Sequence, residues 1–132
     1  MLTILAEDLE SFDNTLPKQR RLLRPAEYRL VFAKNTSVSD RHFIVLSRPN
    51  ALNHARLGMA VAKKHLKRAV DRNTAKRVIR ESFRHQQWQL GNLDVVVLVK
   101  RGIPVHNARA LHGALDTLWQ KLIDKCAQSS HS

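Results

Sequence analysis

The chain has 132 residues, a length that suits one domain with one compact core. Hydrophobic residues make up 43% and charged residues 26%, which is ordinary for a globular protein and excludes collagen-like or low-complexity character. There are 23 lysines and arginines against 11 aspartates and glutamates, and the resulting net charge of +12 predicts a polyanionic partner, in most cases a nucleic acid.

The sequence predicts neither a targeting segment nor a site built from cysteines. No apolar stretch approaches the roughly 20 residues that a membrane-spanning helix needs, and the N-terminus does not read as a secretory signal. The single cysteine, Cys126, excludes an internal disulfide and a CxxC zinc site. We therefore expect a cytoplasmic protein that makes no membrane contact.

The two ends differ in composition from the rest of the chain. Residues 1–16 contain four carboxylates and no basic residue, and we expect them to form an acidic, mobile extension. Residues 17–126 are then the folded domain, and residues 127–132 a polar tail.

The first predicted element is a short helix over Ala26–Ala33, with Pro25 in its first turn, where a missing N–H costs nothing. Tyr28 and Phe32 lie one turn apart on one face of this helix. Their spacing fits core packing or a small platform for stacking bases, and by itself it favours core packing. The polar residues 35–40 that follow indicate a turn or loop.

Three strands and two long helices complete the predicted domain. The strands are His42–Arg48, Arg56–Ala62 and Asp94–Lys100, and the valine-rich third one is typical of a strand covered on both faces. One long helix begins near residues 67–70 and ends near Gln89. The other begins at Asn107, a suitable N-cap, and runs to about Cys126 with one apolar, core-forming face.

The first long helix carries the functional signal. Between Lys63 and Arg84 the chain has nine lysines and arginines against two acidic residues. At about 100° per residue, most of the basic side chains fall on one arc and the apolar ones on the opposite arc. Like charges repeat at i, i+4, where they repel each other, and a bound polyanion would offset that repulsion. The pattern favours nucleic-acid binding through phosphate contacts.

Two motifs identify a family. They are the run from Arg56 to Lys64 (RLGMAVAKK) and the run from Ala69 to Arg84 (AVDRNTAKRVIRESFR). Both resemble the protein subunit of bacterial ribonuclease P, as do Leu93-Asp94, the valine strand and Lys100-Arg101-Gly102 after it. The resemblance covers about residues 18–126.

The resemblance implies a fold and a function. The fold is a single α/β (α+β) domain in which a mixed sheet of about four strands packs with three helices, with a left-handed βαβ crossover. The function is to bind the catalytic RNA of ribonuclease P, in a complex that removes the 5′ leader from precursor tRNA. The RNA with Mg²⁺ is expected to do the chemistry, and no stable protein partner and no catalytic or metal-ligating residue in the protein are implied.

The resemblance also assigns residues. The expected RNA-binding residues are Arg72, Asn73, Lys76, Arg77, Arg80, Arg84, Lys63, Lys64 and Arg68. Thr74 departs from the family pattern, which has a second arginine there. Tyr28 and Phe32 align with the aromatic pair of the family's leader-binding cleft, so the resemblance reverses the preference for core packing at both positions.

Three other functions agree less well with the sequence. An autonomous nuclease would need clustered histidines or carboxylates, but the seven histidines are scattered at no recognisable spacing. A ribosomal-type structural RNA-binding protein fits the size and composition equally well, and only the motifs argue against it. A DNA-binding protein of the helix-turn-helix kind would need a further helix and tight turn before the basic helix.

Overall fold

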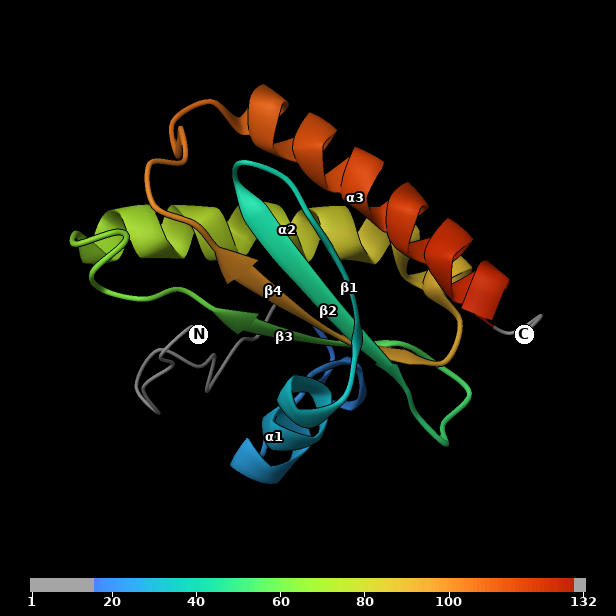
Figure 1. Ribbon diagram of the computed structural model, residues 1–132. Coiled ribbons are helices and arrows are strands. Elements are labelled where there is room, and N and C mark those ends of the chain that lie inside the picture. Colours follow the sequence, from blue (N-terminus) through green and yellow to red (C-terminus); the bar gives the residue numbers. More distant parts are fainter. Residues whose placement is uncertain (1–15, 130–132) are drawn as a thin grey trace.

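The computed structural model describes residues 16–129 (Figure 1). The predicted acidic extension therefore lies outside the described residues, apart from its last residue. Leu16, which the prediction assigned to the extension, is only 2% exposed and belongs to the core. At the other end, the last helix continues to Ser129, three residues past its predicted end.

The fold is a four-stranded mixed sheet with three α-helices, as expected. Its elements, in chain order, are a 3₁₀ turn η2 (Lys18–Arg20), α1 (Pro25–Ala33), β1 (Thr36–Ser39), β2 (Phe43–Pro49), β3 (Arg56–Ala60), α2 (Ala69–Leu90), β4 (Leu93–Val99) and α3 (Ala108–Ser129). The strand order is β1-β2-β4-β3. β2 pairs antiparallel with β1 and β4, whereas β3 pairs parallel with β4 through the βαβ unit that contains α2.

The helices form separate layers on the two faces of the sheet. α2 and α3 lie together on one face and α1 lies alone on the other (Figure 1). All seven residues of β4 are buried, which confirms that this strand is covered on both faces. The larger core lies under α2 and α3, and a smaller one of Leu22, Tyr28, Val31, Leu46, Ala60, Val96 and Leu98 lies under α1.

The prediction of a loop over residues 35–40 was wrong. Residues 36–39 form the edge strand β1, in register with β2 from Thr36 opposite Ser47 to Ser39 opposite Ile44. A serine-rich segment of four residues has little strand propensity of its own. Its hydrogen bonds to β2 make it a strand, and Val38 packs against the larger core.

The contact between Tyr28 and Gly58 sets how closely α1 approaches the sheet. A Cβ atom added to Gly58 would lie 2.6 Å from Cε1 of the Tyr28 ring, so only glycine leaves room for this ring on β3. The backbone N–H of Met59 donates to the Tyr28 hydroxyl oxygen at 3.4 Å. Tyr28 is 2% exposed as a result.

Arg56 ties the beginning of α1 to the sheet. Its guanidinium contacts Glu27 Oε2 at 2.6 Å and Asp94 Oδ2 at 2.7 Å. Glu27 Oε1 also accepts the backbone N–H groups of Leu23 and Arg24. Burial raises the pKa of Glu27, but these two N–H donors and Arg56 outweigh it and leave the pKa below its ordinary value. One charged network therefore fixes α1, β3 and β4 relative to each other.

The segment before α1 runs beside the outer edge of β3. Arg21 forms a parallel bridge with Leu57, and the N–H of Leu22 donates to the Leu57 carbonyl oxygen at 2.9 Å. The side chains of Leu16 and Leu22 enter the two cores on opposite faces of the sheet.

Candidate nucleic-acid interface

The apolar arc of α2 attaches this helix to the protein. Its buried residues are Ala75, Val78, Ile79, Ser82, Phe83 and Leu90. The Trp119 indole N–H on α3 donates to the Ser82 hydroxyl at 2.7 Å, and the Phe83 ring meets the Trp119 ring edge to face. This anchoring fixes which arc of α2 faces outward.

The outward arc is basic, as predicted. Asn73, Arg77 and Arg84 are exposed and lie opposite the buried arc, and we call them the crest of α2. Arg72, Lys76 and Arg80 lie on one flank of the crest and are partly buried. The predicted residues therefore lie together on one surface, but they differ in how far their charged groups reach into solvent.

Arg72 has a structural role that its position in the sequence did not reveal. One guanidinium nitrogen donates to the carbonyl oxygens of Leu66 and Lys67, each at 2.8 Å. These carbonyls belong to the loop that leads into α2. Arg72 thus holds that loop against the first turn of the helix, and its charge is directed to the protein's own backbone.

Thr74, which replaces an arginine of the family pattern, also bonds to its own backbone. Its hydroxyl donates to the Val70 carbonyl oxygen one turn earlier at 2.9 Å. Threonine carries no charge, so this position adds none to the surface of α2.

The two acidic residues of the basic segment lie on the opposite flank. Asp71 Oδ1 is 3.5 Å from His106 Nε2, and Glu81 Oε2 is 3.5 Å from His112 Nε2. His112 belongs to α3, so this flank of α2 faces α3. Glu81 follows Arg77 by one turn, and Asp71 Oδ2 lies 4.0 Å from Nε of Arg68, so both carboxylates border the basic residues on the side that faces α3.

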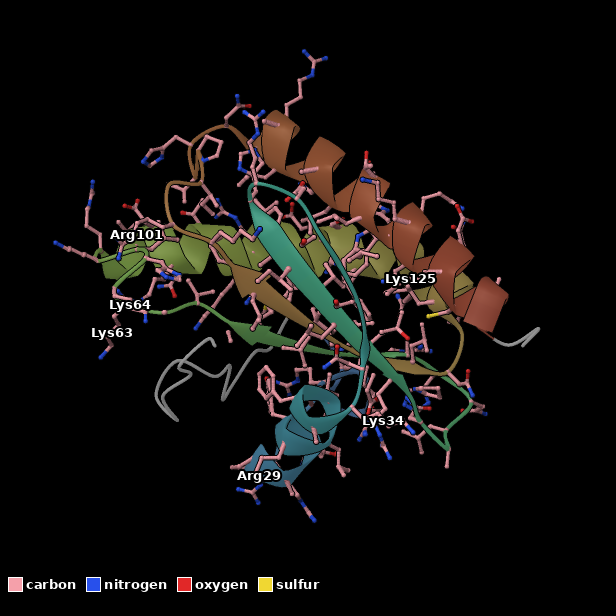
Figure 2. The ribbon with its side chains drawn as sticks, in the orientation of Figure 1. Arg29, Lys34, Lys63, Lys64, Arg101 and Lys125 are labelled. Carbon is pink, nitrogen blue, oxygen red and sulfur yellow. The ribbon has the colours of Figure 1, made fainter. Side chains whose placement is uncertain are left out.

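A second group of basic residues extends the crest beyond the beginning of α2. Lys63, Lys64 and Arg101 gather at one end of the molecule, next to the first turn of α2 (Figure 2). Together with Lys67 and Arg68 they are all exposed. We call these five residues the loop cluster. The helix N-terminus beside them adds partial positive charge.

Arg101 and Lys67 were not among the predicted RNA-binding residues. The signal that could have found Arg101 is topological. β3 and β4 are parallel, so the segments that follow them leave the sheet at the same edge. Lys63 and Arg101 follow these two strands by a few residues and therefore lie at the same end of the sheet (Figure 2).

The predicted aromatic pair on α1 is only partly accessible. The Tyr28 and Phe32 rings stack as their spacing predicts, with centroids 6.5 Å apart and an interplanar angle of 26°. Tyr28 is buried in the core, so only the partly buried Phe32 offers ring surface to a ligand. Tyr28 therefore packs in the core, which is the arrangement that its spacing by itself favoured.

The sheet surface beside Phe32 is the open part of the α1 side. Ile44 of β2 is partly buried there, and Ser37 and Ser39 of β1 are exposed. A cavity of about 400 Å³ lies nearby, lined by Lys34, Asn35, Thr36, Ser47, Arg48 and Pro49. This surface combines one aromatic edge with small polar groups and basic side chains.

The described part of the chain has neither a group of metal ligands nor a membrane-spanning helix. Within residues 16–129, no three histidine, cysteine or acidic side chains lie close enough together to hold a metal ion. No helix in this part of the chain is both long enough and apolar enough to cross a bilayer.

A family model agrees with the sequence motifs. The model described as Ribonuclease P matches residues 16–123. A curated "Ribonuclease P protein component" from Histophilus somni is 48% identical over 106 residues, covering 80% of this chain and 89% of that protein. One from Pasteurella multocida is 47% identical over 113 residues, covering 86% and 94%.

Solved structures share the fold. The ribonuclease P protein of Staphylococcus aureus superposes with a TM-score of 0.69 at 29% identity, covering 76% of this chain and 93% of that one. The ribonuclease P protein of Thermotoga maritima gives a TM-score of 0.65 at 28% identity, covering 76% and 96%.

Proposed function

The chain belongs to the ribonuclease P protein family, and from this membership we propose how its surfaces are used. As a member it is the protein component of a tRNA-processing ribonucleoprotein, a subunit of an endoribonuclease that works with ribonuclease P RNA. None of the comparisons favours the ribosomal alternative.

We assign RNA binding to the crest of α2 and the loop cluster. The observation that carries this assignment is that basic side chains are exposed along the outward arc of α2 and beyond its N-terminus. Arg77 and Arg84 are exposed on the arc opposite the buried one. Lys63, Lys64 and Arg101 lie at the N-terminal end of the helix (Figure 2). Cations along one face can pair with the phosphates of an RNA strand and release their counterions. Lys76 and Arg80 add charge from the flank, and Arg72 acts by holding the loop.

We assign the precursor tRNA 5′ leader to the sheet surface beside α1. Phe32 and Ile44 offer apolar area to unpaired bases, while Lys34 and Arg48 flank the cavity and can pair with phosphates. Contacts of this kind tolerate many leader sequences because every base has a flat apolar face.

We assign the chemistry to the RNA. Mg²⁺ prefers several oxygen ligands, and the described residues bring no cluster of carboxylates together that would hold it. In this proposal the RNA binds the Mg²⁺ ions that take part in cleavage, and the protein binds and orients the two RNA chains.

A reconstitution tests this proposal. The full chain is added to a bacterial ribonuclease P RNA at low Mg²⁺ concentration, and cleavage of precursor tRNA is followed over time. We expect the protein to stimulate cleavage strongly at the leader junction and to be inactive alone after nuclease treatment. Absence of stimulation, or cleavage by the RNA-free protein, would refute it.

Phe32 is the residue that tests leader binding, since Tyr28 cannot be removed without disturbing the core. Phe32→Ala should weaken binding of precursor tRNA with a long leader about fivefold or more, the lower end of what one stacked base contributes. Binding of a substrate with a one-nucleotide leader should stay at the wild-type value. Affinity is measured against leader length, with the melting temperature of each variant.

Tyr28→Phe is the matched control. It keeps the ring against Gly58 and removes only the hydroxyl that Met59 contacts, so it should bind every leader as wild type does. If Phe32→Ala weakens binding equally at all leader lengths, the leader lies elsewhere on the protein.

A further inference from the structure

Trp88, near the end of α2, is an exposed tryptophan that the function described so far does not use. It is 74% exposed, the highest value among the large hydrophobic residues of the described chain. The other tryptophan, Trp119, is fully buried and hydrogen-bonded to Ser82. Tryptophan is the largest hydrophobic side chain, and leaving one this exposed forgoes most of its burial energy.

Trp88 lies in line with the crest of α2, one turn beyond its last residue. It follows Arg84 by four residues and Arg77 by eleven, and at about 100° per residue both spacings bring it within about 40° of those side chains. A flat, exposed aromatic ring therefore follows the crest along the helix.

Arg20 of η2 holds the ring from one side. Its guanidinium carbon lies 4.6 Å from the centroid of the Trp88 ring, within the range of a cation–π contact. Arg20 is positioned in turn by the segment that bridges to β3 at Leu57. A guanidinium can cover one ring face only, and the 74% exposure leaves the other face open to solvent.

We propose that Trp88 is a stacking platform for an unpaired base of the RNA that lies along the crest of α2. This inference rests on the proposed function and extends the RNA-binding surface to the far end of the helix. The open ring face takes the base, and Arg84 and Arg20 beside it meet the phosphates on either side. The ring, held by Arg20, is already oriented before RNA arrives.

The surroundings of Trp88 favour a nucleic-acid base over a protein or a membrane. Its exposed neighbours on α2 are Arg84, His85 and Gln89, which are basic or polar, and Leu90 is buried. A protein-docking face or a membrane-binding face would present several apolar side chains together. An isolated ring among cations instead matches the pattern of single-stranded nucleic-acid binding.

Binding measurements with bacterial ribonuclease P RNA test the platform. Trp88→Leu should bind about tenfold more weakly, and Trp88→Phe about two- to threefold more weakly because a smaller ring still stacks. The dependence of affinity on salt should keep its wild-type slope, since no charge is removed. Melting temperatures should not fall, because the ring is exposed. Leu30→Ala, an exposed apolar residue on α1, is the control and should bind as wild type.

Tryptophan fluorescence gives a second readout from the unmodified protein. Acrylamide should quench Trp88 in the free protein but not Trp119, and saturating RNA should protect Trp88.

If Trp88→Leu binds as wild type, or Trp88 stays accessible to acrylamide at saturation, the platform is refuted. If Trp88→Leu has no effect while loss of Arg77 and Arg84 weakens binding, only this inference fails. If neither change weakens binding, the proposed function of the crest fails too.

Discussion

Arg56→Met is expected to destabilise the fold by about 3–5 kcal/mol, the usual cost of leaving a buried charge without its partner. The Asp94 side chain is only 6% exposed, and two guanidinium nitrogens of Arg56 contact its two oxygens at 2.8 and 2.7 Å. After the substitution, the Asn50 amide is the one side-chain donor to this carboxylate that remains among residues 16–129. Urea unfolding followed by circular dichroism measures the change.

The double variant Arg56→Met/Asp94→Leu is the control. It removes both charges together and should recover a large part of the lost stability. If Arg56→Met alone costs less than about 1 kcal/mol, the pair is worth no more than an exposed surface pair.

Acid titration gives an independent check on the same network. The folded state lowers the pKa of Glu27 from its ordinary value of 4.5, so this group stabilises the fold above pH 4.5 and ceases to do so as the pH falls through the lowered value. Since Arg56 is one cause of the shift, the Arg56→Met variant should show a shallower loss of stability in this pH window.

Arg77→Ala/Arg84→Ala should weaken binding to ribonuclease P RNA about tenfold or more at near-physiological salt. Each arginine that reaches a phosphate contributes about 0.7–0.9 units to the slope of log affinity against log salt, so the slope should flatten by about 1.4–1.8 units. Both side chains are exposed and face away from the core, so stability should change little. Filter binding across a salt series measures both quantities.

Lys121→Ala/Lys125→Ala removes the same charge from α3 and is the control. Lys125 Nζ donates to the Ser37 carbonyl oxygen of β1 at 2.8 Å, so the melting temperature of this variant is measured alongside its binding. It should keep the wild-type slope. Equal effects of the two double variants would mean that the RNA responds to the total charge of the protein, and the crest would then not be a specific surface.

The secondary structure of the core could be predicted because its signals are local. The valine run became β4, Asn107 caps α3 through the Ala110 N–H, and the basic helix was found with its correct outward arc. β1 could not be found, since its strand character comes from hydrogen bonds to β2 and not from its own residues.

The site was harder to predict where the position of a side chain depends on residues far away in the sequence. Helical spacing placed Tyr28 and Phe32 side by side, but the depth of Tyr28 depends on Gly58, thirty positions away on β3. Arg72 lies at the edge of the basic arc. Its guanidinium bonds to the carbonyl oxygens of Leu66 and Lys67, and this is visible only once the path of the loop before α2 is known. Residue type and helical spacing do not contain this information.

The backbone that runs beside β3 has a consequence for self-association. An open strand edge offers unpaired N–H and C=O groups to the sheet of another molecule, and proteins block such edges to stay monomeric. Here Arg21 and Leu22 occupy the outer side of β3 at Leu57, and the opposite edge of the sheet is β1, a strand of only four residues. Within the described residues, each outer edge of the sheet therefore offers only a short length of unpaired strand to the sheet of another molecule.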